Sequence, residues 1–345
     1  MRVLLLLLIS LTAAGFAVGY TVWSDAGRSK ESAPGLGLVE IDDPAQLANV
    51  QSRPHVIFIN TQPGPGTGRV AVVPLDNLDG PRYLTPLRCA RVYFAGNTGV
   101  CLRATAGLIS PYHAVTFDRR FVPGPEIPLQ GYPSRARVAP NGSVAAMTVF
   151  VHGHSYASGG LSTSTTLVDV ATQRQIVEME SVTAYKQGQP FRAIDFNYWG
   201  VTFAPDSDRF YATLSTAGQM WLVEGRVTSR EVRLLREGVE CPSLSPDGRR
   251  IVFKRRTASA APSWRLHVAG LDAGEAVAIG DERSVDDQAA WLDNDHVLYA
   301  LRHQDSALAA RGVADLWVTP ADGSTPPRRF LAAAYSPAVV SPGVP

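Results

Sequence analysis

Short apolar runs bounded by Gly, Pro, Asn or Asp recur along most of the chain, and each run predicts a β-strand. The clearest group lies between Glu240 and Gly280, where four strands follow one another within about 40 residues. They span Cys241 to Ser245, Arg249 to Arg256, Trp264 to Leu271 and Ala276 to Ile279. The body of the sequence has no long apolar period of 3.6 residues, so few helices are expected. The pattern predicts an all-β fold.

A tight polar turn that leads into β-branched or aromatic residues is repeated in variant form. The best copy is Ser245-Pro246-Asp247-Gly248. Its variants are Ala139-Pro140-Asn141-Gly142, Ala204-Pro205-Asp206-Ser207 and Leu292-Asp293-Asn294-Asp295, and Gly96-Asn97-Thr98-Gly99 fits as an earlier turn. Asp247 is interpreted as a turn residue rather than a metal ligand or nucleophile, because Asp in such turns bonds its own backbone. Four-strand units repeated at intervals of about 40–65 residues predict a β-propeller.

The first and last strand groups complement each other. The first group, His55 to Asn60, Gly68 to Asp76 and Pro81 to Thr85, has no inner strand before it. A spare strand, Tyr335 to Val340, follows the last group. Pairing the spare strand with His55 to Asn60 would close a six-bladed ring and hide two sheet edges. Two insertions are expected in the longest repeat interval, His152 to Thr166 and Glu180 to Asp195.

The chain is divided into three parts by these patterns. Residues 1–23 are expected to be a secretory signal peptide or a transmembrane anchor, because Arg2 precedes a long apolar run. Cleavage and retention both remain open, so contact with a membrane is expected only through this segment if it is uncleaved. Residues 24–50 are interpreted as a linker and 51–342 as the propeller. The body is therefore expected to be extracytoplasmic, either secreted or anchored to the cytoplasmic membrane.

Charge excludes one class of partner. The 345 residues carry 32 Lys and Arg against 31 Asp and Glu, a formal net charge of +1. No basic field is available to condense on a polyanion, so no nucleic-acid partner is expected.

A family resemblance follows from the repeat. Ser245-Pro246-Asp247-Gly248-Arg249-Arg250-Ile251-Val252-Phe253 resembles the repeat of TolB-type six-bladed propellers, and residues 50–342 are similar to exported bacterial proteins described as TolB-like. Residues 196–205, Glu240 to Ser243 and Ser284 to Gln288 extend the likeness. The resemblance implies a six-bladed propeller. It leaves function open, because propellers serve as binding scaffolds and as enzymes.

Three cysteines suit an oxidising compartment. Cys89 and Cys101 flank the turn at Gly96 to Gly99, and their proximity in the sequence favours a disulfide. A turn centred on residue 97 or 98 would place Cys101 opposite residue 94, whereas a turn centred on Ala95 would pair the two cysteines. Cys241 is then expected to be a buried free thiol.

Polar residues at the starts of the inner strands are the candidate site. In a propeller these positions gather around one mouth of the central channel, where groups from different blades converge. The expected ligand-binding residues are Arg88, Arg135, Asn197, Trp199, Glu240, Asp286 and Asp287. Tyr132, Asp195 and Ser336 occupy equivalent positions. Mixed charge at one concave mouth suits an amine-bearing or zwitterionic partner such as a peptide terminus.

The sequence favours a non-enzymatic propeller that binds an envelope protein, a peptide or a small envelope ligand at this mouth. The alternative is a hydrolase or lyase that uses the mouth carboxylates, and a purely structural module is a third possibility. No catalytic residue, metal or cofactor is assigned. Gly153-His154-Ser155-Tyr156-Ala157 lacks the helix that a nucleophile elbow needs. His152 and His154 lack a legible third metal ligand.

Overall fold

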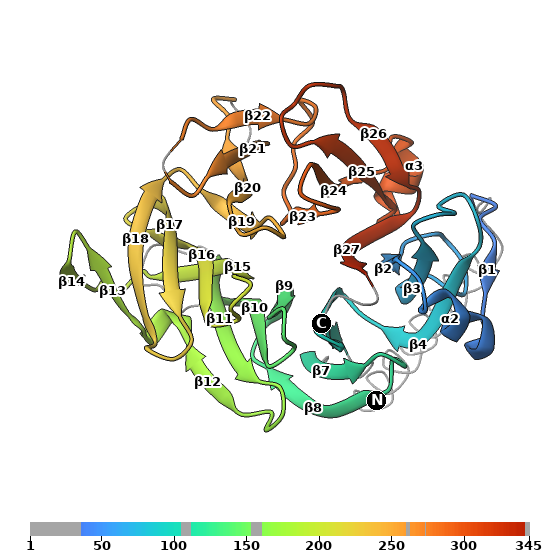
Figure 1. Cartoon of the computed structure of the whole chain (residues 1–345), viewed down its shortest axis with the longest axis horizontal. Helices are drawn as coiled ribbons and strands as arrows, with labels where there is room; N and C mark the ends of the chain where they lie inside the picture. The colour runs from blue at the N-terminus through green and yellow to red at the C-terminus, as the bar shows by residue number, and fades with distance from the viewer. Residues whose placement is uncertain (1–35, 105–111, 153–160, 260–262, 273, 342–345) are drawn as a thin grey trace, which may run out of the picture. The chain divides into compact units, whose positions relative to one another are not determined.

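The computed structural model describes residues 36–104, 112–152, 161–259, 263–272 and 274–341. Within residues 38–341 the strands form six sheets that follow one another around a ring (Figure 1). The prediction of a six-bladed all-β propeller is confirmed. The predicted signal peptide or anchor and the first part of the predicted linker, to residue 35, lie outside the described residues.

Each blade is one sheet of four to six strands. Blade 1 holds β1 (Glu40–Ile41), β4 (Arg82–Arg88), β3 (Arg69–Pro74), β2 (His55–Asn60) and β27 (Ala334–Val340). Blade 2 holds β5 (Arg91–Ala95), β6 (Thr98–Ala104), β7 (Tyr112–Asp118) and β8 (Pro123–Leu129). Blade 3 holds β9 (Tyr132–Val138), β10 (Val144–His152), β11 (Leu161–Asp169) and β12 (Gln175–Glu178).

The remaining blades follow the same plan. Blade 4 holds β15 (Asn197–Phe203), β16 (Arg209–Thr216), β17 (Gln219–Arg226), β18 (Glu231–Glu237), β13 (Thr183–Lys186) and β14 (Gln189–Phe191). Blade 5 holds β19 (Glu240–Leu244), β20 (Arg250–Arg256), β21 (Trp264–Gly270) and β22 (Val277–Ile279). Blade 6 holds β23 (Ala290–Trp291), β24 (His296–Arg302), β25 (Ala314–Pro320) and β26 (Arg328–Leu331). The helices are α2 (Pro44–Val50) and α3 (Ser306–Ala310), with a 3₁₀ turn η1 (Met179–Ser181).

The ring is closed by the last strand, as predicted. β27 is the inner strand of blade 1 and pairs antiparallel with β2, from His55 opposite Val340 to Asn60 opposite Ala334. The buried Arg82 guanidinium donates to the Asn60 side chain at 2.7 Å and to the Ala333 carbonyl at 3.0 Å. Strand pairing and this arginine together hold the two ends of the propeller in one sheet.

The hydrophobic core of the described residues lies between the blades. One cluster joins blades 1 and 6, and further clusters fill each of the other contacts between neighbouring blades. Because both faces of a blade are covered, an internal strand can be apolar throughout. β2 shows this, since all its residues from His55 to Asn60 are buried.

The repeated turns connect the inner strand of a blade to the next strand. In the turn before β20, the Gly248 N–H donates to the Ser245 carbonyl at 2.9 Å and Gly248 has a φ of 71°. The Asp247 carboxylate accepts from the Ser245 hydroxyl at 2.5 Å and from the Arg249 N–H at 3.1 Å. The structure therefore gives Asp247 the contacts of a turn residue, as the sequence predicted.

Three regions differ from the sequence prediction. Residues 40–50 are not a linker: β1 pairs in parallel with β4, and α2 begins after Asp43, whose carboxylate accepts from the Ala45 N–H at 2.8 Å. Residues 161–166, expected in an insertion, belong to β11 of blade 3. In the second expected insertion, β13 pairs in parallel with β18 and extends blade 4 outward. Residues 153–160, which include His154 and Ser155, lie outside the described residues.

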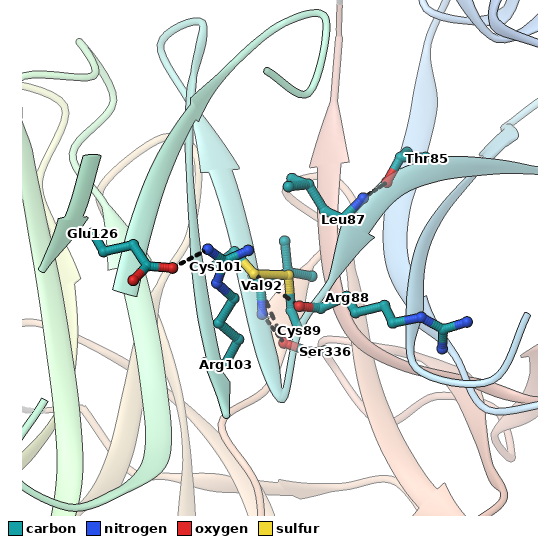
Figure 2. The surroundings of a disulfide bond; sticks show 9 residues. All are labelled: Thr85, Leu87, Arg88, Cys89, Val92, Cys101, Arg103, Glu126 and Ser336. Carbon is teal, nitrogen blue, oxygen red and sulfur yellow. Dashed lines mark hydrogen bonds and ion pairs between the residues drawn. A yellow bond between two sulfur atoms is a disulfide. The ribbon is translucent and has the colours of Figure 1, made fainter. Parts of the chain in front are cut away.

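The predicted disulfide is present, in a different register from either one considered. Figure 2 shows Cys89 bonded to Cys101, with Cα atoms 5.4 Å apart. Cys101 lies opposite Val92, because Gly96 and Asn97 both take positive φ in a two-residue turn. Cys89 precedes β5, so the bond ties the connection between blades 1 and 2 to β6. The third cysteine, Cys241, is free and buried, as predicted.

Candidate functional site

An ion-pair network joins distant blades at the end of the ring where the inner strands begin, which we call the start end. The Asp287 carboxylate lies 2.9 Å from Arg91 Nη1 and 3.3 Å from Arg135 Nε. Arg91 begins β5 in blade 2 and Arg135 lies in β9 of blade 3, whereas Asp287 precedes β23 of blade 6. The Asp287 side chain is only 12% exposed. One nearly buried carboxylate therefore reaches arginines from two other blades.

The residues after Asp287 bond to further blades. The Gln288 side-chain amide donates to the Val201 carbonyl at 3.1 Å in blade 4 and to the Pro242 carbonyl at 2.7 Å in blade 5. Arg137 Nη2 of blade 3 donates to the Ala289 carbonyl at 2.8 Å. The segment 287–289 thus spans the centre of the ring at the start end.

A second part of the network surrounds Lys254, whose side chain is 5% exposed. Its ammonium pairs with Asp286, lies 4.0 Å from Glu240 Oε2 and sits 4.4 Å from the centre of the Trp264 ring. The Trp264 indole N–H donates to Glu240 Oε1 at 3.0 Å, and Arg256 Nε is 3.6 Å from the same oxygen. These side chains neutralise one another.

Burial and neighbouring charge oppose each other in this network. Burial acts to raise the pKa of Asp287, but Arg91 and Arg135 outweigh it and hold that pKa below its ordinary value. Burial lowers the pKa of Arg91, against the attraction of Asp287. Burial also acts to lower the pKa of Arg135, but the attraction of Asp287 outweighs burial and the pKa of Arg135 is raised. Asp287 therefore stays ionised and holds both guanidinium groups in place.

The structure brings together Arg135, Glu240, Asp286 and Asp287 and leaves the other predicted ligand-binding residues apart. Arg88 is exposed and donates to the carbonyls of Pro65, at 2.6 Å, and Thr67. Asn197 accepts from the Thr163 N–H at 2.8 Å and donates to the Asp195 carbonyl. Trp199 is half-buried within β15.

Two of the remaining predicted positions also make structural contacts. The Ser336 hydroxyl donates to the Val92 carbonyl at 2.9 Å, next to the disulfide in Figure 2. The Tyr132 ring stacks edge-on against Tyr112, with centroids 5.5 Å apart.

A small pocket of about 180 Å³ beside Asn197 contains a carboxyl group that the sequence did not single out. Glu180 accepts from the N–H groups of Thr165, at 2.9 Å, and Tyr198, at 3.1 Å. Burial outweighs these bonds and raises the pKa of Glu180 to about 8. Glu180 lies in the segment interpreted as an insertion, where no local pattern marks a buried acid.

A larger cavity lies at the other end of the inner strands, which we call the turn end. It has a volume of about 1020 Å³ and is lined by every blade. Each blade contributes at least one residue to its wall, among them Tyr93, Arg137, Thr202, Ser243, Trp291 and Val339. The sequence pointed to the start end, whereas the structure places the cavity at the turn end. Its wall is formed by the ends of the inner strands, whose apolar and hydroxyl side chains carry no distinctive pattern.

Two arginines give this cavity its charge. Arg119 and Arg137 line it, and its described lining contains no Asp or Glu. Arg137 is 8% exposed, its guanidinium carbon lies 4.4 Å from the centre of the Tyr93 ring, and its Nε has no hydrogen-bond partner. Burial lowers the pKa of Arg137. Arg137 follows Arg135 by two residues and so shares its strand face, and this spacing is the sequence signal that marks Arg137.

No protein-family model and no curated protein sequence matches the chain. Among solved structures it is similar to TolB from Acinetobacter baumannii, with a TM-score of 0.57 and 15% identity over 84% of this chain and 66% of that chain. The fold is a TolB-like six-bladed β-propeller. This chain therefore spans 66% of the length of that TolB structure.

Two other solved structures are also similar to this chain. One is a chain of a nidogen/laminin complex, with a TM-score of 0.52 and 10% identity over 83% of this chain and 98% of that chain. Another is a puromycin-hydrolysing peptidase of Mycobacterium tuberculosis, with a TM-score of 0.47 and 11% identity over 77% of this chain and 42% of that chain. At such identities the likeness shows the fold alone. Neither helix of the described propeller is long and apolar enough to cross a membrane.

Proposed function

We propose that this TolB-like propeller is an exported, non-enzymatic binding protein whose central cavity takes a peptide or protein segment, or a small envelope ligand, from the turn end. The observation that carries the proposal is the cavity of about 1020 Å³ lined by every blade. Ligand sites are usually concave and mostly apolar, with a few placed polar groups. Tyr93, Trp291 and Val339 supply apolar surface here, and Arg137 supplies charge.

Residues at the start end stabilise the blades that surround the cavity. Asp287 and Gln288 are nearly buried and bond to several blades, so they hold together the blades that form the cavity wall without lining the cavity themselves. Direct contact of a ligand with Arg135, Glu240, Asp286 and Asp287 stays a prediction. The pairing of these charges with Arg91 and Lys254 favours approach from the turn end.

The cavity charge points to a ligand that carries a carboxylate. A buried guanidinium without an ion-pair partner is costly, and a ligand anion would compensate it through charge-assisted hydrogen bonds. Arg137 occupies this position in the described lining, with Arg119 exposed near the opening. This replaces the amine-bearing or zwitterionic ligand that the start-end charges suggested.

The same contacts weigh against the alternative of a hydrolase or lyase. Its carboxylates would be Glu240, Asp286 and Asp287, and each has a cationic partner in the network. A catalytic acid or base needs access to a substrate, and the side chains of Glu240 and Asp287 are 6% and 12% exposed.

The test measures binding of a fluorescent mixture of short apolar peptides with free C-termini, compared with the same mixture amidated. We expect tighter binding of the free acids. Arg119→Gln should weaken it about fivefold, whereas Arg120→Gln, the adjacent exposed arginine, should not change it. Arg137→Lys should weaken it about tenfold or more while the protein stays folded. Equal binding of acid and amide would overturn the carboxylate assignment, and unchanged binding in all variants would overturn the location.

A further inference from the structure

A cluster of arginines without carboxylate partners lies where blades 4 and 5 meet, outside the central cavity. Arg255 in β20 and Arg265 in β21 are directly opposite each other in the antiparallel register. Phe253 and His267 form another opposite pair, two residues along, on the same face of the sheet. Like charges directly opposite on neighbouring strands destabilise a sheet, so this pairing needs compensation.

A third arginine reaches the same place from blade 4. The guanidinium carbon of Arg236, in β18, lies 5.8 Å from the centre of the Phe253 ring, and that of Arg255 lies 5.5 Å from it. The His267 ring stacks on Phe253 with centroids 5.9 Å apart. Phe253 is fully buried, while the three arginines and His267 are half-buried. Arg236, Arg255 and His267 therefore gather around the Phe253 ring, Arg265 lies opposite Arg255, and all four side chains remain partly exposed.

The contacts of these arginines do not neutralise them. Arg236 donates to the Gly274 carbonyl at 3.5 Å and Arg255 to the Gly238 carbonyl at 3.4 Å. Arg265 Nε is buried without a hydrogen-bond partner. In the described part of the chain no carboxylate lies within ion-pair distance of the three, although nearby Arg233 pairs with Glu224 and Arg256 with Glu240.

We propose that Arg236, Arg255 and Arg265 form a binding site for a phosphoryl group at the interface of blades 4 and 5. Arginine suits this ligand because its planar guanidinium donates two parallel hydrogen bonds to a phosphate. An anionic phosphoryl group would offset the repulsion between Arg255 and Arg265 and would satisfy the donors that they leave free. Such a group can come from a soluble phosphate ester or from a phospholipid headgroup.

His267 provides a reporter inside the cluster. Burial lowers its pKa, and the positive charges of Arg255 and Arg265 lower it further. A bound anion would reverse the second effect. We therefore expect inorganic phosphate to raise the pKa of His267, measured by NMR, by about one unit relative to chloride at the same ionic strength.

The variants test whether the arginines cause this shift. Arg255→Gln with Arg265→Gln should abolish the phosphate-dependent shift and leave the protein at least as stable, because it removes a repulsive pair. Arg236→Gln alone should weaken phosphate binding about tenfold. Arg249→Gln is the matched control for Arg236→Gln, since Arg249 is exposed in the turn that precedes β20 and the change of charge is the same.

Two soluble probes distinguish the sources. Tighter binding of glycerol phosphate indicates a soluble ester, and tighter binding of dihexanoyl phosphatidylglycerol indicates a lipid headgroup. Either result supports the proposal if the double variant, Arg255→Gln with Arg265→Gln, no longer binds that probe. No shift of the His267 pKa with any phosphate, or an equal shift in the double variant, overturns the site. This outcome is independent of peptide binding in the central cavity.

Discussion

Arg91 and Asp287 are 196 residues apart in the chain, yet their side chains pair at 2.9 Å across the start end of the ring. Arg135 approaches the other oxygen of the same carboxylate at 3.3 Å. One acid thus compensates two nearly buried arginines from different blades. The pairing joins blades 2, 3 and 6 at the start end, whereas the cavity lies at the turn end.

Asp287→Asn should therefore destabilise the protein by about 3–5 kcal/mol, because it leaves Arg91 and Arg135 buried without a counter-charge. Asp286→Asn is the matched change, and since the Asp286 side chain is 59% exposed we expect a loss of less than about 1 kcal/mol. Urea unfolding of both variants measures the difference. If Asp287→Asn lowers the free energy of unfolding as little as Asp286→Asn does, the Asp287 contacts contribute little to stability.

The disulfide should be the only cross-link in the protein. Non-reducing peptide mapping should recover Cys89 joined to Cys101, and Cys241 should react with an alkylating reagent only after denaturation. Closing a loop of this length contributes about 3 kcal/mol in the chain-entropy description. A reductant should therefore lower the melting temperature of the wild type and leave Cys89→Ser with Cys101→Ser unchanged. A wild type indifferent to reductant would contradict this.

Closure by β27 can be tested by truncation. A chain ending after Leu331 loses the inner strand of blade 1 and the buried Ala334 and Ala338, so we expect it not to fold cooperatively. A chain ending after Ser341 keeps β27 and should unfold like the full chain. Circular dichroism melting curves of both distinguish the outcomes, and a cooperative transition in the shorter chain would rule the closure out.

Glu180 should make stability fall as pH rises. Burial raises its pKa to about 8 in the folded state, from the ordinary value of 4.5 for an exposed glutamate. Between these values the unfolded chain releases a proton that the folded chain keeps, so the free energy of unfolding decreases with pH and levels off above about 8. Glu180→Gln should flatten this part of the profile. Glu275→Gln, at an exposed position, should keep the wild-type slope.

Local sequence patterns were enough to predict much of the fold. The turn at Ser245 to Gly248 and its variants marked the inner hairpins because Pro, Asp and Gly each meet a specific need of the turn. The absence of an inner strand before His55 and the spare strand at Tyr335 predicted closure, since an unpaired edge must be covered. Asp43 was missed as a helix cap because a seven-residue helix leaves little periodic signal.

The site was harder to predict than the fold. Asp287 was expected at the start of an inner strand, but β23 is only two residues long. The preceding residues are therefore free of a strand ladder and bond across the ring, and no local pattern encodes that path. Which end of the channel is open depends on how these side chains meet. Arg135 and Glu240 lie at the start end, as the sequence predicted. Arg91, which pairs with Asp287, and Lys254, which pairs with Asp286 and lies near Glu240, were not identified.

The position of β27 also constrains the order in which the molecule can form. β27 lies between the rest of blade 1 and the channel, although a ribosome makes it after every other strand of the propeller. Blade 1 therefore lacks its inner strand while the five later blades are synthesised. Until then β2 presents an unpaired apolar edge that a neighbouring nascent chain can bind. The inner edge of blade 1 therefore stays unpaired until the chain through Val340 is available.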